Sequence, residues 1–416
     1  MPTVDIHRRT LSNGLRVVVC PDHGAPTVTV NVTYRVGSHD EWPARTGLAH
    51  LFEHLMFDNT STGLEKQYDL YCTKAGGSNN AYTTFDHTTY FINLPSHQVE
   101  LGFWLEAERM RDFMITDHAL TTQKSVVIEE IKQNVENQPY GRWRTATEEA
   151  AYTPDCHYHW EVYGSSEHVA SVSMDDARTF YEKYYRPSNA ALVVAGDVTP
   201  DVAFDMAERH FGHIVSPSAA IERTSYDDAW RVFGAHSVVP DAVPMPAVFI
   251  SFHMPGIFDT ASYSAEIAAM VLGSGRTSPL YKHLVNDLRI ASSAMAFFDR
   301  RANTSLLTIY AHANEESVTA DQLAAAVMEA IQGYTCTEED FEKASNRIRT
   351  ALAAEIQRNE GVADSVASYT VFFDDPGLVN TVLDNYAAQT RESVQAMIDR
   401  CRSIDDGIRV DVVPNA

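Results

Sequence analysis

The sequence lacks features that would place the protein in several common classes. Lys and Arg number only 32 against 56 Asp and Glu, so the formal net charge is −24. Binding to nucleic-acid phosphates requires basic stripes that release counterions, so we expect no nucleic-acid partner. The longest apolar runs, such as 190–195 and 247–250, are far shorter than a bilayer-spanning helix. We therefore expect no membrane partner either.

Cysteine pairing motifs are also missing. The chain has five cysteines, an odd number, and they are widely scattered without a C-x-x-C pair: Cys20, Cys72, Cys156, Cys336 and Cys401. This pattern argues against a disulfide framework and against a thiolate zinc site, and it indicates reduced thiols. The first ten residues contain no apolar segment typical of a signal peptide. We therefore expect a cytoplasmic protein.

Apolar patterns in the first part of the chain predict strands followed by a helix. Segments 15–19 and 27–36 are rich in Val, Thr and Tyr with partial alternation, as in neighbouring strands. Apolar residues then recur at helical spacing, which predicts a helix over His50 and His54. The segment 76–80, with two glycines and two asparagines, predicts a turn before a further pair of strands.

The second part of the chain repeats this order of elements. After the stretch 215–230, which has no periodicity, a strand at 247–253 and a helix at 263–272 follow one another. We therefore predict an α+β fold of two related α/β-sandwich halves, each a mixed sheet packed with helices. Their predicted bounds are 1–216 and 231–416, and the second helix carries no histidine. We expect only the first half to bind a metal.

Two histidines provide the first chemical signal. In a helix, His50 and His54 lie on one face, so both ring nitrogens can reach one zinc ion. Glu53 lies beside them, where its carboxylate can polarise a zinc-bound water. Two solvent-facing histidines with other partners would give the same spacing. A catalytic zinc needs a third protein ligand, and spacing alone does not choose among Glu129, Glu130 and Glu136.

The residues around this helix resemble the pitrilysin-type zinc peptidases, a family with an inverted His-x-x-Glu-His motif. Its members include the mitochondrial processing peptidase. This chain resembles the short bacterial relatives of that enzyme. The similarity is carried by Val36–Ser38, Glu41, Thr46–Phe57, Gly76–Gly77, Asn80–Thr83, Val126–Glu130, Tyr185–Asn189 and Val194–Asp197. It implies the two-halved fold of the processing-peptidase-like metallohydrolases and a zinc-dependent endopeptidase acting on short or unfolded peptides.

The resemblance also implies roles for individual residues. Zinc would be held by His50, His54 and Glu130, with Glu129 as the alternative if the register differs by one. Glu53 would be the general base that activates water and then returns the proton to the leaving amine. An extended peptide would pair with a strand formed by Asn80, Ala81, Tyr82 and Thr83. Residues 1–216 would thus be the zinc-binding catalytic domain.

Three positions depart from the family pattern. Gln123 stands where many members have a second glutamate, which removes one charge from the surroundings of the metal. In the later half, Val285 and Ser292 occupy the places of an Arg and a Tyr that hold substrate and the developing oxyanion. Neither side chain can replace those donors.

The missing donors predict a partner subunit. We expect a heterodimer in which this chain brings zinc and a zinc-less homologous subunit brings the Arg and Tyr. Arg276 and Tyr281 are nearby donors that would instead suit a homodimer. A third hypothesis is a non-catalytic scaffold subunit. The presence of His50, Glu53, His54 and Glu130 argues against it.

Overall fold

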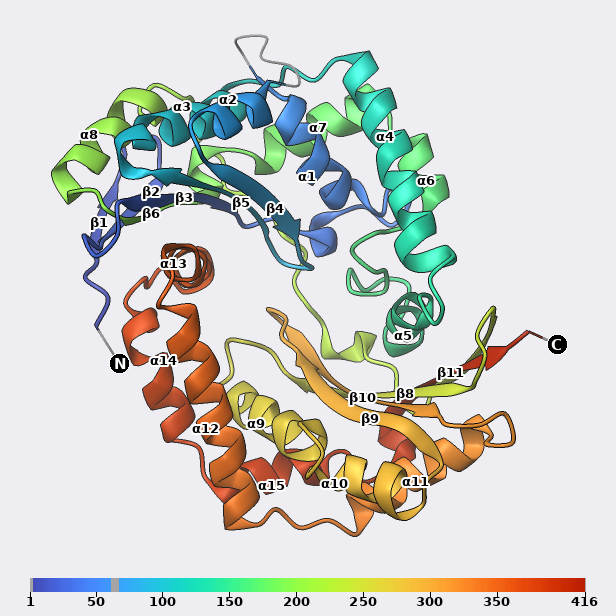
Figure 1. Ribbon diagram of the computed structural model, residues 1–416. Helices are drawn as coiled ribbons and strands as arrows, with labels where there is room; N and C mark the ends of the chain where they lie inside the picture. Colours follow the sequence, from blue (N-terminus) through green and yellow to red (C-terminus); the bar gives the residue numbers. More distant parts are fainter. Residues whose placement is uncertain (1–2, 61–66, 416) are drawn as a thin grey trace. The chain divides into compact units, whose positions relative to one another are not determined.

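The computed structural model describes residues 3–60 and 67–415, and Figure 1 shows it as a ribbon. The chain divides into two compact units. The first comprises Met1–Glu129, Val162–Thr224 and Leu352–Val382, and the second comprises Glu130–Glu161, Ser225–Ala351 and Leu383–Ala416. The predicted halves follow chain order instead, so their boundary between 216 and 231 stays a prediction.

The first unit is built on a mixed six-stranded sheet with the order β1-β2-β6-β3-β5-β4. The strands are β1 His7–Thr10, β2 Arg16–Pro21, β3 Thr27–Tyr34, β4 Ser78–Thr83, β5 Thr88–Pro95 and β6 Ala190–Gly196. Only β2 and β6 pair in parallel. Asn79 and Asn80, which the sequence places in a turn, belong to β4 because this strand pairs with β5 from Ser78 onward.

Helices cover both faces of this sheet (Figure 1). α3 packs on β3 and β5, α8 packs on β2, and α1 lies beside β4. α13 packs on β3 and β6 through an apolar cluster that joins Val362 and Val366 to Val18 and Val193. The helices of this unit are α1 Leu48–Asp58, α2 Tyr68–Lys74, α3 Val99–Arg111, α6 Ser166–Ser171, α7 Met174–Tyr184, α8 Pro200–Phe211 and α13 Asn359–Phe373.

The second unit repeats the strand order of the first. Its sheet runs β7-β11-β8-β10-β9, with β7 His236–Asp241, β8 Ala247–Pro255, β9 Ala291–Asp299, β10 Thr304–Ala313 and β11 Gly407–Pro414. β7 and β11 are parallel and the other pairs are antiparallel. This pattern matches β2-β6-β3-β5-β4, and α9 follows β8 as α1 follows β3. The prediction of two related halves with mixed sheets is confirmed.

Further helices complete the described chain. They are α5 Trp143–Ala151, α9 Ala261–Gly273, α10 Pro279–Tyr281, α11 Ala320–Gln332 and α15 Arg391–Asp399 in the second unit, with α4 Asp117–Ile131, α12 Glu338–Glu355 and α14 Leu378–Ala387 running through unit boundaries. Within residues 3–60 and 67–415, no helix is both long and apolar enough to cross a bilayer.

Each sheet is covered on one face by a helix from a distant part of the chain. α5 packs on β7, β8 and β11, and the Trp143 ring stacks on Phe249 with 4.6 Å between ring centroids. α13 covers the first sheet, although it follows β10 in the sequence. The two compact units are therefore interleaved along the chain.

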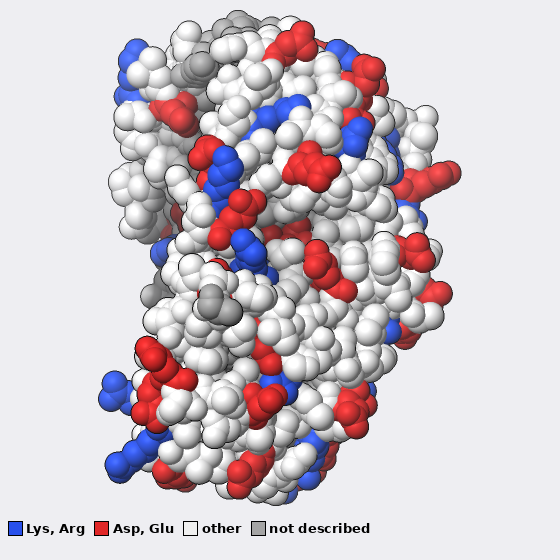
Figure 2. All heavy atoms as spheres, turned by 90° about the vertical axis from the view of Figure 1, so that its right-hand side faces the viewer, with Lys and Arg blue, Asp and Glu red and all other residues white. Residues whose placement is uncertain are grey.

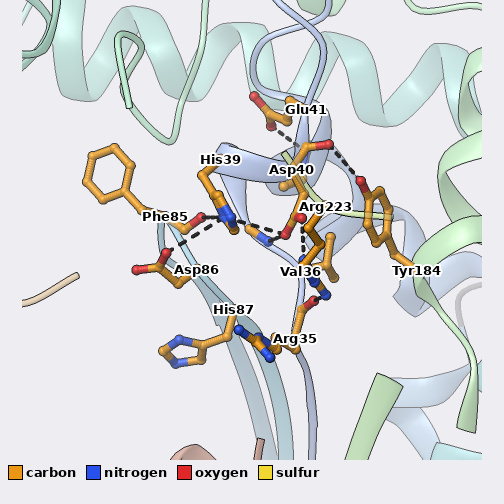
Figure 3. A network of polar contacts seen from close by, with 12 residues as sticks. Arg35, Val36, His39, Asp40, Glu41, Phe85, Asp86, His87, Tyr184 and Arg223 are labelled. Carbon is orange, nitrogen blue, oxygen red and sulfur yellow. Dashed lines mark hydrogen bonds and ion pairs between the residues drawn. The ribbon is translucent and has the colours of Figure 1, made fainter. Parts of the chain in front are cut away.

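The connection from β3 to α1 is held by a buried carboxylate. Glu41 is 1% exposed and accepts hydrogen bonds from the N–H groups of Gly47, at 3.0 Å, and Ala49, at 2.7 Å. Gly47 is the N-cap residue and provides no side chain, so Glu41 supplies the cap from six residues upstream. The preceding residue in this loop, Asp40, forms an ion pair with Arg223 (Figure 3).

This cap leads to a stability prediction. In Glu41→Gln, one carboxylate oxygen is replaced by an NH₂ group, which cannot accept a backbone hydrogen bond. We expect a loss of about 1–3 kcal/mol, the range for a buried donor left without a partner. Urea unfolding measures the loss, and amide hydrogen exchange at Gly47 and Ala49 should accelerate.

The control is Glu100→Gln, because the Glu100 side chain is 51% exposed. It should change stability by less than about 0.5 kcal/mol, as surface substitutions usually do. Equal stability of the two variants would show that Glu41 does not cap the helix.

Candidate functional site

Three side chains with metal-binding atoms converge in the structure. His50 and His54 on α1 and Glu130 on α4 each offer a ligand atom, and these atoms all lie within 4.8 Å of one another. His50 is 6% exposed, whereas His54 and Glu130 are half-buried. This is the only such group of three among the described residues. The structure thus brings together the three residues predicted as ligands.

Helix α4 distinguishes the two neighbouring glutamates. Glu129 is exposed and is not part of the converging group, whereas Glu130 is. The boundary between the compact units falls just before Glu130. Glu130 nevertheless continues helix α4, which starts at Asp117, so its position follows from that helix. The geometry therefore favours Glu130, and its role as a ligand stays a prediction.

Gln123 links α4 to α1. Its side-chain amide nitrogen Nε2 donates a hydrogen bond of 2.7 Å to Oδ2 of Asp58, which is 6% exposed at the end of α1. A glutamate at position 123 would place two carboxylates against each other there. The glutamine is therefore matched to Asp58 and helps to hold the two helices together.

The electrostatics of the group suit a metal ion. Burial, with the nearby His54, lowers the pKa of His50 to about 3. The ring is therefore neutral at physiological pH, which is the form that binds metals. Two imidazoles and one carboxylate are a common protein ligand set of catalytic zinc and leave one position open. The residues present thus fit zinc.

Glu53 is oriented by the edge strand β4. The Thr83 hydroxyl donates a hydrogen bond of 2.7 Å to Oε2 of Glu53. Glu53 lies between the two histidines' positions on α1 and is half-buried. The predicted base and the last residue of the predicted substrate strand are therefore in direct contact.

A second bond fixes β4 from the opposite side. The hydroxyl of Tyr82 donates to Oδ1 of Asp364 on α13, at 2.5 Å. Burial raises the pKa of Asp364 to about 6, and the bond from Tyr82 opposes this shift. Sequence reasoning missed Asp364, because no local pattern shows that α13 packs on this sheet.

The positions of the missing donors lie in the second unit. Val285 is half-buried in the π-helical turn Lys282–Asp287, and Ser292 is exposed on β9. The Ser292 hydroxyl donates a hydrogen bond of 3.2 Å to the carbonyl of Ala313. Arg276 is exposed and Tyr281 is half-buried.

Two family models match the sequence. The model described as "Insulinase (Peptidase family M16)" matches residues 16–154, and the model described as "Peptidase M16 inactive domain" matches residues 171–348. The first match contains His50, Glu53, His54 and Glu130. The second contains the positions of the missing donors.

Individual relatives are similar over most of the chain. "Zinc protease PqqE" of Helicobacter pylori is 28% identical over 89% of this chain and 84% of its own length. A "Probable mitochondrial-processing peptidase subunit beta" of Arabidopsis thaliana is 24% identical over 86% of this chain and 68% of its own. A crystal structure of a protease from Helicobacter pylori has a TM-score of 0.92 at 25% identity, covering 99% of this chain and 100% of that one.

The geometry of α4 predicts a contrast between two adjacent substitutions. Glu130→Gln should weaken zinc binding by more than about 100-fold, because even the outer partners of metal ligands contribute about 10–100-fold. Glu129→Gln, its matched control, should leave the zinc affinity unchanged. Competition with a chromogenic chelator measures both. The opposite result would move the third ligand to Glu129.

Proposed function

This chain belongs to the M16 family of peptidases, and we propose that it is a zinc-dependent endopeptidase that hydrolyses short or unfolded peptides. The convergence of His50, His54 and Glu130 beside Glu53 carries the proposal. Structural zinc sites normally use four protein ligands, whereas the described residues offer three here, the number typical of a catalytic site with an open position. The relatives named zinc protease support the same metal.

The residues of this chain have distinct parts in the proposed reaction. His50, His54 and Glu130 would hold zinc, which when bound supplies a Lewis acid for the scissile carbonyl. Glu53 accepts a proton from the attacking water and returns it to the leaving amine. The Thr83 hydroxyl fixes the carboxylate of Glu53 for both transfers.

The edge strand β4 is the proposed binding site for the peptide backbone. It pairs with β5 on one side, and no described strand pairs with its other side. The Ala81 N–H is bonded to Oδ1 of Asn80 at 2.9 Å. This N–H is thus engaged locally, and an added strand would replace the bond. Backbone pairing selects extended chains over folded ones, so unfolded peptides suit it.

We further propose that a zinc-less homologous subunit completes the active site. Val285 and Ser292 provide no strong oxyanion donor, and Ser292 already donates to a backbone carbonyl. The Arabidopsis relative is itself named as a subunit. A homodimer using Arg276 and Tyr281 is the alternative assembly. A non-catalytic scaffold is the alternative function, since one matching model is described as an inactive domain.

A cytoplasmic location is part of the proposal. All five cysteines are buried and free of disulfides. Burial also raises the pKa of Cys156 and Cys336 to about 11, which keeps these thiols protonated. Several cysteines without a disulfide are typical of proteins in reducing compartments.

The base assignment is tested by Glu53→Gln. The amide cannot accept a proton, so the rate of peptide hydrolysis should fall by about 10²- to 10⁴-fold, the usual contribution of a general base. Zinc content should stay at that of the unsubstituted chain, because Glu53 is not in the ligand group. Both are measured on the assembled enzyme with an unstructured fluorogenic peptide. Normal turnover in this variant would refute the assignment.

The partner proposal predicts weak activity of the isolated chain. Purified alone, it should bind zinc but hydrolyse the peptide slowly, and adding the copurified homologous subunit should raise the rate. Robust hydrolysis by the isolated chain would contradict the heterodimer. Loss of that activity in Arg276→Gln or Tyr281→Phe would then identify the homodimer.

A further inference from the structure

A cavity lies in the first unit, and none of the metal-site residues lines it. Its volume is about 470 Å³, which is within the range of small-molecule sites. It lies where the chain enters β2 and β6, and residues 216–221 cross beside it. Its polar lining includes Arg186, Ser12, Ser188, Ser216 and Ser218.

Arg186 is a buried cation without a paired anion. The residue is 8% exposed, and its guanidinium makes one hydrogen bond, from Nη2 to the carbonyl of Ala219 at 2.7 Å. Its Nε is buried without a hydrogen-bond partner in the described structure. Burial and the neighbouring Arg223 lower the pKa of Arg186. A desolvated guanidinium in this setting favours an added anion.

Other buried arginines of the chain are paired. Arg301 contacts Glu148 at 2.6 Å, and Arg109 contacts Glu106 at 3.3 Å. Arg223, which bonds the cavity residue Asn189, is paired with Asp40 (Figure 3). Among the described residues, Arg186 is therefore the buried arginine that forms no ion pair with a carboxylate.

The lining of the cavity carries a positive charge and no negative one. It contains no Asp or Glu, although the chain has a net charge of −24 and acidic side chains are spread over the face in Figure 2. Ser216 Oγ donates to Ser188 Oγ at 2.9 Å. The Ser188 hydroxyl proton can therefore point elsewhere, toward a ligand. An arginine with serine hydroxyls is a donor set suited to phosphate oxygens.

We propose that this cavity binds a phosphate group, either as the free ion or on a small polar molecule. The anion pairs with the Arg186 guanidinium and accepts hydrogen bonds from the serine hydroxyls. The volume of the cavity accommodates more than the ion alone, so a phosphorylated small molecule fits as well. The site is separate from the peptidase chemistry and does not depend on the proposed function.

The test is a calorimetric titration of the full-length chain with inorganic phosphate, glycerol 3-phosphate and acetate. We expect saturable binding of both phosphates and weaker binding of acetate, which has fewer acceptor oxygens. Tighter binding of glycerol 3-phosphate assigns the site to a phosphorylated molecule, and tighter binding of inorganic phosphate assigns it to the free ion.

Variants locate the binding in this cavity. Arg186→Met should weaken phosphate binding by about tenfold or more, the effect of losing a charge-assisted hydrogen bond. Ser218→Asp, at an exposed rim position, should weaken it similarly by repulsion without disturbing the core. Arg209→Met, in which a 59% exposed side chain is removed, is the matched control and should bind as the unsubstituted chain does. Absence of saturable binding, or equal binding by all variants, would overturn the proposal.

Discussion

The proposed chemistry of this chain depends on how helix α1 is held. A rotation of the helix by one residue, about 100°, would turn its two histidines away from α4. The carboxylate of Glu41 opposes such a rotation because it bonds the N–H groups of Gly47 and Ala49. Gly47 also has φ +84°, and a Cβ there would lie 2.4 Å from the carbonyl of Tyr163. The segment before the helix therefore determines where the proposed ligands His50 and His54 point.

Two polar bonds then place the neighbouring elements against α1. Gln123 bonds Asp58 at one end of the helix, and Thr83 bonds Glu53 near its middle. The first bond helps to hold α4, which carries the third proposed ligand, and the second holds the edge strand. Reactive side chains are most effective when such contacts fix their geometry in advance. The proposed site is thus supported by residues outside the proposed ligand set.

The sequence predicted the local parts of this arrangement and missed its tertiary parts. The spacing of His50 and His54 is a property of one helix, so it could be read directly. Spacing alone could not choose Glu130 over Glu129, because their exposure depends on the packing of α4. Nor could it assign α5 and α13 to their sheets, since an apolar helix face does not identify its partner. For the same reason the contact between Asp364 and β4 could not be foreseen.

The second half shows that this fold does not need the metal residues. In α9, Ile267, Ala268 and Ala269 are buried in the helix that corresponds to α1, and the strand order is preserved. Apolar burial therefore stabilises the architecture of both halves, whereas only the first half carries the proposed metal-site residues. Because fold and chemistry are separable in this way, one subunit can supply the metal and another the oxyanion donors. In the proposed heterodimer, Val285 and Ser292 of this chain need no donor chemistry, because the partner subunit would supply the Arg and Tyr.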